Sequence, residues 1–273
     1  MPVGDVSLSA SARTNLLSLQ QTDKSLSVTQ ARLATGKKVS TALDNATAFF
    51  AAMGFLNKAN DLAALKDNLS TAVQTVKAAV DGITAVTSVV TQMQGVLNSA
   101  LETSDTGTRS ALAQQYNSLR TQIDNLATDS IFNGTNLLTS TGTSLSVYFN
   151  SSNTSSLTIT GVNVTTSGLG ITTAANAFAA TSDIQAAQSL LTSALTTLRS
   201  DSTSFGNNNT LITTRSTFTD SLINTLQTAS DNLVLADINQ EGANLEALQA
   251  RSKLGVVALG ISGDQAQGIL KLF

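Results

Sequence analysis

The chain has 273 residues, a formal net charge of -3 and 12% charged residues, about half the share usual in soluble proteins. It has no cysteine and no histidine, which excludes disulfides, thiolate and imidazole metal sites, and catalysis by Cys or His nucleophiles. The basic residues are scattered, so we expect no nucleic-acid partner and no membrane partner. We also expect no cofactor.

The N-terminal segment predicts an amphipathic helix from about residue 9 to residue 34. Ala12, Leu19, Leu26 and Leu33 recur every seven residues, which is the spacing of a coiled-coil seam. The strip is narrow, and such a helix is marginal alone. We therefore expect it to order only when a partner covers the strip. Residues 1–12 lack the basic and apolar regions of a cleavable signal peptide.

The longest regular pattern runs from Leu62 to Ala100, where apolar residues recur in alternating steps of three and four. This spacing predicts a long helix that serves as the spine of a bundle. No charge falls between Gly82 and Leu101, so we expect this helix to have neighbours on more than one side. The main spine residues are Leu62, Leu65, Leu69, Val76, Ile83, Val86, Val90, Met93 and Leu97.

A second amphipathic helix is predicted from Arg109 to about Asp129, folded back on the long one as an antiparallel hairpin. It leads to Asn133-Gly134, a pair that tolerates positive φ in a tight turn. From residue 141 to 166 the apolar period becomes two, which predicts short strands at 145–149, 157–159 and 162–164. No residue between Asp129 and Asp183 is charged, so this segment is expected to be O-glycosylated or packed against copies of itself.

Helical spacing returns after Asp183, a candidate N-cap, and continues to about residue 233. An interruption at residues 206–209 leaves open whether this is one helix or two. Asp237 and Glu241 follow, one helical turn apart. Such an acidic pair is far more often part of a solvated or interface surface than an acid/base couple, and no other catalytic constellation is present. We therefore predict that the protein is not an enzyme.

Several motifs resemble those of bacterial flagellins. The segment 32–39 followed by 44–46 is similar to the flagellin link between the two N-terminal helices, with Asn45 in place of a second Asp. Phe-Asn-Gly at 132–134 resembles the family's exit from the helical hairpin. The C-terminal stretch aligns with the family terminus without a gap, and its residues depart from the family pattern at 262–266 and at Phe273. The motif residues are Arg32, Leu33, Gly36, Asp44, Phe132, Asn133, Gly134, Asn232, Leu233, Asp237, Glu241, Gln249 and Gly255.

The resemblance implies a mainly α fold, a long antiparallel bundle with paired terminal helices and a small β-rich middle insertion. Residues 1–44 and 238–273 would form the axial core of a filament, 45–140 with 178–237 a helical bundle, and 141–177 a variable surface segment. It also implies that the helix from 183 to 233 is continuous. The residues expected to pack in the axial core are Leu19, Leu26, Leu33, Leu245, Leu248, Leu259 and Leu270.

By the same resemblance, the chain would be the subunit of an extracellular bacterial flagellar filament used for swimming. It would be secreted through the flagellar type III export channel. Its partners would be other copies of itself, the flagellar cap, hook-junction proteins and an export chaperone. The alternatives are a hook-filament junction protein, or, if the resemblance is set aside, a non-flagellar coiled-coil adaptor.

Overall fold

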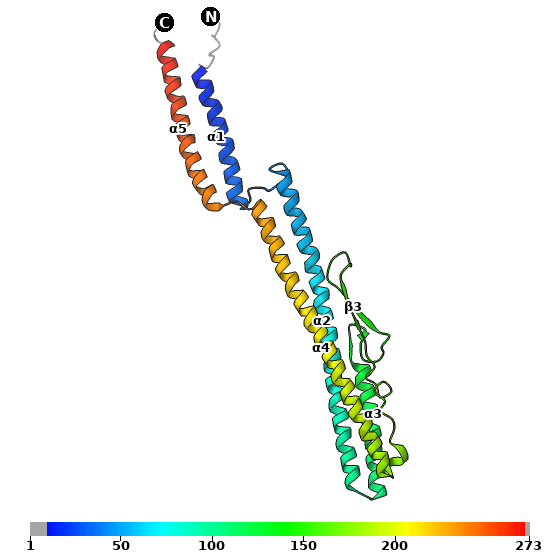
Figure 1. The fold of residues 1–273 in the computed structure, drawn as a ribbon. Coiled ribbons are helices and arrows are strands. Elements are labelled where there is room, and N and C mark those ends of the chain that lie inside the picture. The colour runs from blue at the N-terminus through cyan, green and yellow to red at the C-terminus, as the bar shows by residue number, and fades with distance from the viewer. Residues whose placement is uncertain (1–9, 271–273) are drawn as a thin grey trace. The chain divides into compact units, whose positions relative to one another are not determined.

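The computed structural model describes the backbone of residues 10–270 and the side chains of residues 10–265 (Figure 1). The predicted mainly α fold is confirmed, with two short hairpins and a 3-10 turn between the third and fourth long helices. Contacts divide the chain into two compact units, residues 58–224 and the two ends up to 57 and from 225. The helices are α1 (Ala10–Thr35), α2 (Ala46–Glu102), α3 (Thr106–Asp129), α4 (Thr181–Val234) and α5 (Ile238–Leu270).

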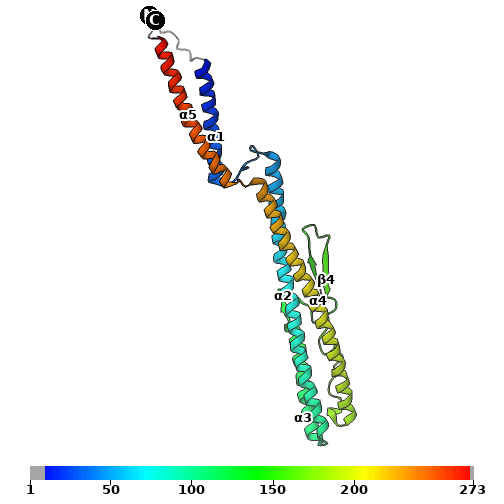
Figure 2. The same cartoon turned by 60° about the vertical axis from the view of Figure 1, so that its left-hand side comes forward.

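In the unit 58–224, α2, α3 and α4 lie side by side (Figure 1 and Figure 2). Arg109, in the first turn of α3, donates to the Ala100 carbonyl near the end of α2. Gly82, further back along α2, lies against Ser130 just beyond the other end of α3. The two helices are therefore antiparallel, as predicted. Apolar residues of all three helices and of the insertion form one continuous core, which includes Tyr116 of α3 and Phe205 of α4.

The helix α2 begins sixteen residues before the predicted start at Leu62. Asn45 caps it, since its side-chain oxygen accepts a hydrogen bond from the Ala48 N–H (3.0 Å). The added turns bury only small residues, Ala52 and Ala59, so they carry no strong apolar stripe. The spacing of large apolar residues therefore predicted the spine but not the start of the helix.

The helix α4 is continuous across residues 206–209, as the resemblance to flagellins implied. Gly206 has no neighbouring side chain that would demand a break. The candidate N-cap was wrong, because α4 begins at Thr181 and Asp183 lies inside its first turn. There the carboxylate still faces the positive end of the helix dipole.

The middle segment forms two separate antiparallel hairpins. The strands β1 (Ile131–Phe132) and β2 (Thr135–Asn136) enclose the turn Asn133-Gly134, and β3 (Ser144–Tyr148) pairs with β4 (Ser156–Thr160). The third predicted strand, at 162–164, does not form. Val162 and Val164 donate their N–H groups to the carbonyls of Leu137 and Leu138. This stretch is therefore hydrogen-bonded to the residues that follow β2, where Thr139 and Asn163 form an isolated bridge.

A segment from Asn163 to Phe178 lies along the polar side of α3. Three α3 side chains hold it: Asn117 accepts from the Ala174 N–H (3.0 Å), Arg120 donates to the Ile171 carbonyl (3.1 Å), and Asp124 accepts from the Thr166 N–H (2.8 Å). The segment ends in the 3-10 turn η1 (Ala175–Phe178). Hydrogen bonds from α3 side chains thus hold in place a segment that is irregular up to this turn.

Arg109 is a buried cation that the sequence pattern did not identify as a core residue. Its guanidinium donates to three carbonyls, those of Ala100, Thr103 and Ala179, and to the Thr181 hydroxyl. It therefore ties the end of α2 to the start of α4. The one available signal was an arginine in the first turn of a helix, where the helix dipole disfavours a cation.

Among residues 10–270, no helix is both long enough and apolar enough to cross a lipid bilayer.

Candidate functional site

The two ends of the chain meet as an antiparallel helix pair, α1 with α5. Three contacts set the register. Arg32 meets Glu241 at one end of the pair (3.0 Å), and the Ser252 hydroxyl donates to the Asp23 carboxylate further along (3.4 Å). Leu19 lies so close to Gly255 that a methyl group added to that glycine would touch its side chain.

The centre of this pair is formed by small and β-branched residues. Ala12, Thr22 and Thr29 are the buried residues of α1, and the Thr22 hydroxyl is satisfied by the Ser18 carbonyl (2.8 Å). The predicted axial leucines of α1 and α5 are only half-buried, and the Leu270 side chain lies outside the described residues. Half-buried are Leu19, Leu26, Leu33, Leu245, Leu248 and Leu259.

The same two helices also present apolar side chains on their outer sides. On α5, Leu254 is 70% exposed and Val257 60% exposed. On α1, Leu17 is 66% exposed and Val28 50%. A helix that is apolar on more than one side needs more than one partner to bury it. The pair α1 and α5 therefore covers only part of its own apolar surface.

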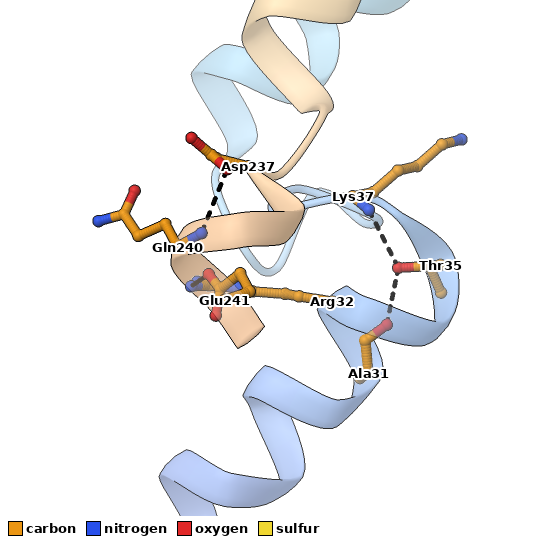
Figure 3. A network of polar contacts seen from close by, with 7 residues as sticks. All are labelled: Ala31, Arg32, Thr35, Lys37, Asp237, Gln240 and Glu241. Carbon is orange, nitrogen blue, oxygen red and sulfur yellow. Dashed lines mark hydrogen bonds and ion pairs between the residues drawn. The ribbon is translucent and has the colours of Figure 1, made fainter. Parts of the chain in front are cut away.

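Near the end of α1 and the start of α5, an ion pair joins the two helices (Figure 3). Arg32 reaches Glu241 with one guanidinium nitrogen at 3.0 Å from Oε1, and the Glu241 side chain is only 10% exposed. The other carboxylate oxygen, Oε2, is buried without a hydrogen-bond partner among the described residues. Asp237 accepts from the N–H groups of Asn239 and Gln240 and so caps the start of α5.

These contacts give both acidic residues of the 237/241 pair a structural role. Asp237 is occupied as a helix cap and Glu241 as the partner of Arg32. Glu241 faces the Arg32 guanidinium, and the Asp237 carboxylate faces backbone N–H groups. That the pair belongs to a solvated or interface surface stays a prediction.

The connection from α1 to α2 is held by backbone bonds to the end of α4. Gly36 has φ +68°, a conformation that glycine adopts without strain, and its carbonyl accepts from the Ala236 N–H (2.9 Å). Lys38 donates its backbone N–H to the Val234 carbonyl (2.8 Å) and its ammonium group to the Asn232 carbonyl (2.9 Å).

Asp44 closes this connection into a compact loop. Its Oδ2 accepts from the N–H groups of Ser40 and Thr41, both at 2.9 Å, and from the Thr41 hydroxyl. The backbone hydrogen bond from Thr41, followed by the one from Ser40, lowers the pKa of the Asp44 carboxyl below its ordinary value. These hydrogen bonds favour the charged form of the carboxyl.

Beside the ion pair lies an open polar groove of about 590 Å³. It brings together the motif residues Arg32, Asp44, Asn232, Asp237 and Glu241, which are far apart in the sequence. The described residues contain no cluster of metal-ligating side chains. The groove thus brings charged and amide side chains from distant parts of the sequence to one place.

The remaining motif residues have simpler surroundings. Leu233 is half-buried in the last turn of α4, whereas the side chains of Gln249 and Phe132 are exposed. Asn133 and Gly134 form the β1–β2 turn, with φ of +47° and +77°.

In the unit 58–224, the predicted spine residues all lie in the interior. Leu62 and Leu65 are 7% exposed. The others are at most 1% exposed: Leu69, Val76, Ile83, Val86, Val90, Met93 and Leu97. Opposite them, the uncharged stretch of α2 presents an exposed face of small polar groups, formed by Thr84, Ser88, Thr91, Gln92, Gly95 and Ser99.

Comparison with known proteins gives a consistent result. Residues 6–143 match the family described as the bacterial flagellin N-terminal helical region. The chain is 32% identical to Flagellin FljO of Caulobacter vibrioides over the full length of both chains, and 30% identical to a flagellin of Brucella melitensis over 97% of each. A crystal structure of Bacillus cereus flagellin covers 62% of this chain and is itself covered to 93%, with a TM-score of 0.47 and 16% identity.

The resemblance seen in the sequence is thereby confirmed. Flagellins are structural proteins rather than enzymes, which agrees with the absence of cysteine and histidine from the whole sequence. Because the family match covers half of the chain and the relatives align along its full length, the protein belongs to the bacterial flagellin family.

Proposed function

We propose that this protein polymerises through its paired terminal helices into an extracellular flagellar filament that drives swimming. The observation that carries the proposal is the apolar outer surface of α1 and α5, which their mutual packing leaves exposed. In a helical polymer, the same helices of other copies would cover this surface. Full-length similarity to proteins named flagellin favours a filament subunit over a hook-filament junction protein.

In this proposal each expected domain has its own place in the filament. Residues 1–44 and 238–273 line the axial core, where the half-buried leucines of α1 and α5 complete their burial against neighbouring copies. Residues 45–140 with 178–237 form the outer bundle, and 141–177 project from it. The uncharged segment after Asp129 is the proposed place for O-linked sugars.

Export and assembly factors complete the proposal. The subunit leaves the cell unfolded through the flagellar type III channel, assisted by a chaperone, and adds at the distal tip beneath the cap. Hook-junction proteins are further expected partners. Ends that fold only on assembly would prevent premature polymerisation. The narrow seam of α1, with threonines at its centre, suits an element that needs partners to stay ordered.

Removing residues 240–273 tests the proposal. The truncated chain should form no filaments on seeding with filament fragments, as seen by electron microscopy, because α1 loses its partner. Circular dichroism should still show a helical bundle, since the core of the unit 58–224 is untouched. Filaments of normal length from the truncated chain would overturn the proposal.

A point variant separates assembly from the pairing of α1 with α5. Val257→Lys places a charge on the exposed side of α5, where burial against another copy would require its desolvation. Seeded polymerisation should be lost while the helix content of the monomer stays unchanged. Val257→Leu is the matched control and should polymerise like the original chain.

A further inference from the structure

We propose that Asn133 is a site of spontaneous deamidation, at which the folded chain converts its side-chain amide to an acid over time. The reacting groups are the side-chain amide of Asn133 and the backbone N–H of Gly134. This is the only Asn-Gly pair in the sequence. The inference concerns the chain itself and does not rest on filament formation.

The β1–β2 hairpin leaves both reacting groups free. The strands pair Phe132 with Thr135, so the two turn residues lie outside the ladder. The described residues provide no hydrogen bond to the Gly134 N–H or to the Asn133 side chain. Both residues are exposed, and no atom would contact a Cβ placed on Gly134. Nothing therefore holds the amide away from the backbone nitrogen, and no side chain shields that nitrogen.

The reaction balances with water as the only co-reactant. The Gly134 nitrogen, after losing its proton to hydroxide, attacks Cγ of Asn133. The bond from Cγ to the side-chain nitrogen breaks, and that nitrogen takes a proton from water and leaves as ammonia, which regenerates hydroxide. The Gly134 nitrogen and Cγ are now joined in a five-membered succinimide. Water then opens either of the two ring C–N bonds. The product is an aspartate or an isoaspartate in place of Asn133, with one added negative charge.

Asn153 is an exposed asparagine whose neighbouring N–H is hydrogen-bonded, which should protect it from deamidation. It also has positive φ, +55°, and it is exposed. However, the N–H of the next residue, Thr154, donates to the Asn150 side-chain oxygen (2.9 Å). Within the helices, the N–H that follows an asparagine is engaged in the helical hydrogen-bond ladder, except after Asn239, where the Gln240 N–H donates to the Asp237 cap (3.2 Å). Outside them, Asn136 is held by bonds from both ends of its amide.

The modification would change the local chemistry of the insertion. Asn133 lines a neutral groove of about 260 Å³ together with Asn68, Thr71 and Tyr148. A new carboxylate would be the sole charge between Asp129 and Asp183. Isoaspartate would also add a backbone atom to a two-residue turn, which would disturb the pairing of Phe132 with Thr135.

The test follows the full-length folded chain during incubation in mildly alkaline buffer, with a parallel sample in urea. Peptide mapping by mass spectrometry measures acid formation at each asparagine, and enzymatic methylation detects isoaspartate. In the folded sample, conversion should occur first at Asn133, faster at higher pH, and at a rate similar to that in urea. Asn153 should convert only in urea.

Two variants sharpen the result. Asn133→Gln should abolish the early acidic species, because ring closure through the longer side chain is slower. Asn153→Gln, the matched control, should leave that species unchanged. Conversion of Asn133 only in urea, or earlier conversion of Asn153 in the folded chain, would overturn the proposal.

Discussion

At the scale of single residues, the buried hydroxyl of Tyr116 is poorly matched to its surroundings. The ring packs edge-on against Phe178 with centroids 5.3 Å apart, and its oxygen is buried without a hydrogen-bond partner among the described residues. Burial disfavours the phenolate and raises the pKa of Tyr116 from 10.0 to about 12. The folded state therefore holds the proton more tightly than the unfolded chain.

This shift gives the stability of the unit 58–224 a defined pH dependence. The contribution of neutral Tyr116 is complete below the unfolded pKa of 10.0 and is lost as pH rises toward about 12. Tyr116→Phe should remove this alkaline loss and should not lower stability at pH 7, because no hydrogen bond is given up. Urea unfolding followed by circular dichroism at several pH values measures both effects. Tyr148→Phe, at an exposed position, should keep the alkaline loss.

A second residue-scale feature is a left-handed turn in η1. Asn176, Ala177 and Phe178 have φ of +47°, +50° and +60°. Left-handed backbone costs a residue with a Cβ about 1–2 kcal/mol. Phe178 is fully buried, so its apolar burial offsets this strain and keeps the turn in place.

Ala177→Gly should therefore stabilise the protein. Glycine relieves the left-handed strain, about 1–2 kcal/mol, and gives up about 0.5–1 kcal/mol through its greater chain entropy. The net gain should be at most about 1.5 kcal/mol and should appear as a higher midpoint of thermal unfolding. Ala179 lies two residues away with an ordinary φ of -59°, so Ala179→Gly should lower the midpoint. A fall with both variants would contradict the argument.

At the scale of elements, two glycines of α2 occupy opposite environments. A Cβ on Gly82 would overlap the Ser130 hydroxyl and the Leu138 side chain, whereas Gly95 is exposed with no atom within 4 Å. Gly82 thus permits close packing against the segment that follows α3. It belongs to the interior and not to the uncharged outer face that the sequence suggested for residues 82–101.

The two glycines should respond to alanine with opposite signs. Gly95→Ala should raise the free energy of unfolding by about 1 kcal/mol through helix propensity. Gly82→Ala gains the same propensity but should be destabilising overall, since overpacking a well-filled core costs about 1–3 kcal/mol. Urea unfolding of both variants measures the difference. Equal stabilisation by both would show that the packing at Gly82 is loose.

The sequence predicted those elements in which apolar residues recur at a regular spacing. The α2 spine could be identified because each large apolar residue returns to the same face. The paired ends were identified only by resemblance, since the α1 strip is narrow and its buried centre includes Thr22 and Thr29. Arg109 and the left-handed turn could not be predicted, because they depend on carbonyls and ring contacts distant in sequence.

At the scale of the whole molecule, the low charge content favours burial of the surface against other copies. Only 12% of the residues are charged, and the exposed face of α2 opposite the spine consists of hydroxyl, amide and glycine positions. Such a surface can be buried against another copy without desolvating ions. The proposed polymer would thus use apolar contacts at the chain ends and neutral polar contacts along the bundle.

Thr91 offers a direct test of this neutral face. Among the described residues, its hydroxyl donates only to the Thr87 carbonyl one turn earlier (2.9 Å), and its side chain is exposed, so replacement should leave the bundle folded. Thr91→Glu adds a charge that assembly would have to bury without a partner, which is costly. Seeded polymerisation, followed by light scattering and electron microscopy, should be strongly impaired, while the urea midpoint of the monomer changes little.

Thr91→Gln is the matched control. Glutamine has nearly the same size as glutamate, and this variant loses the same hydroxyl but gains no charge. It should polymerise at close to the original rate. If glutamate and glutamine impaired assembly equally, shape rather than charge would govern this contact. If neither impaired it, the neutral face of α2 would lie outside the subunit interface, and the small polar residues there would have to be explained by the monomer alone.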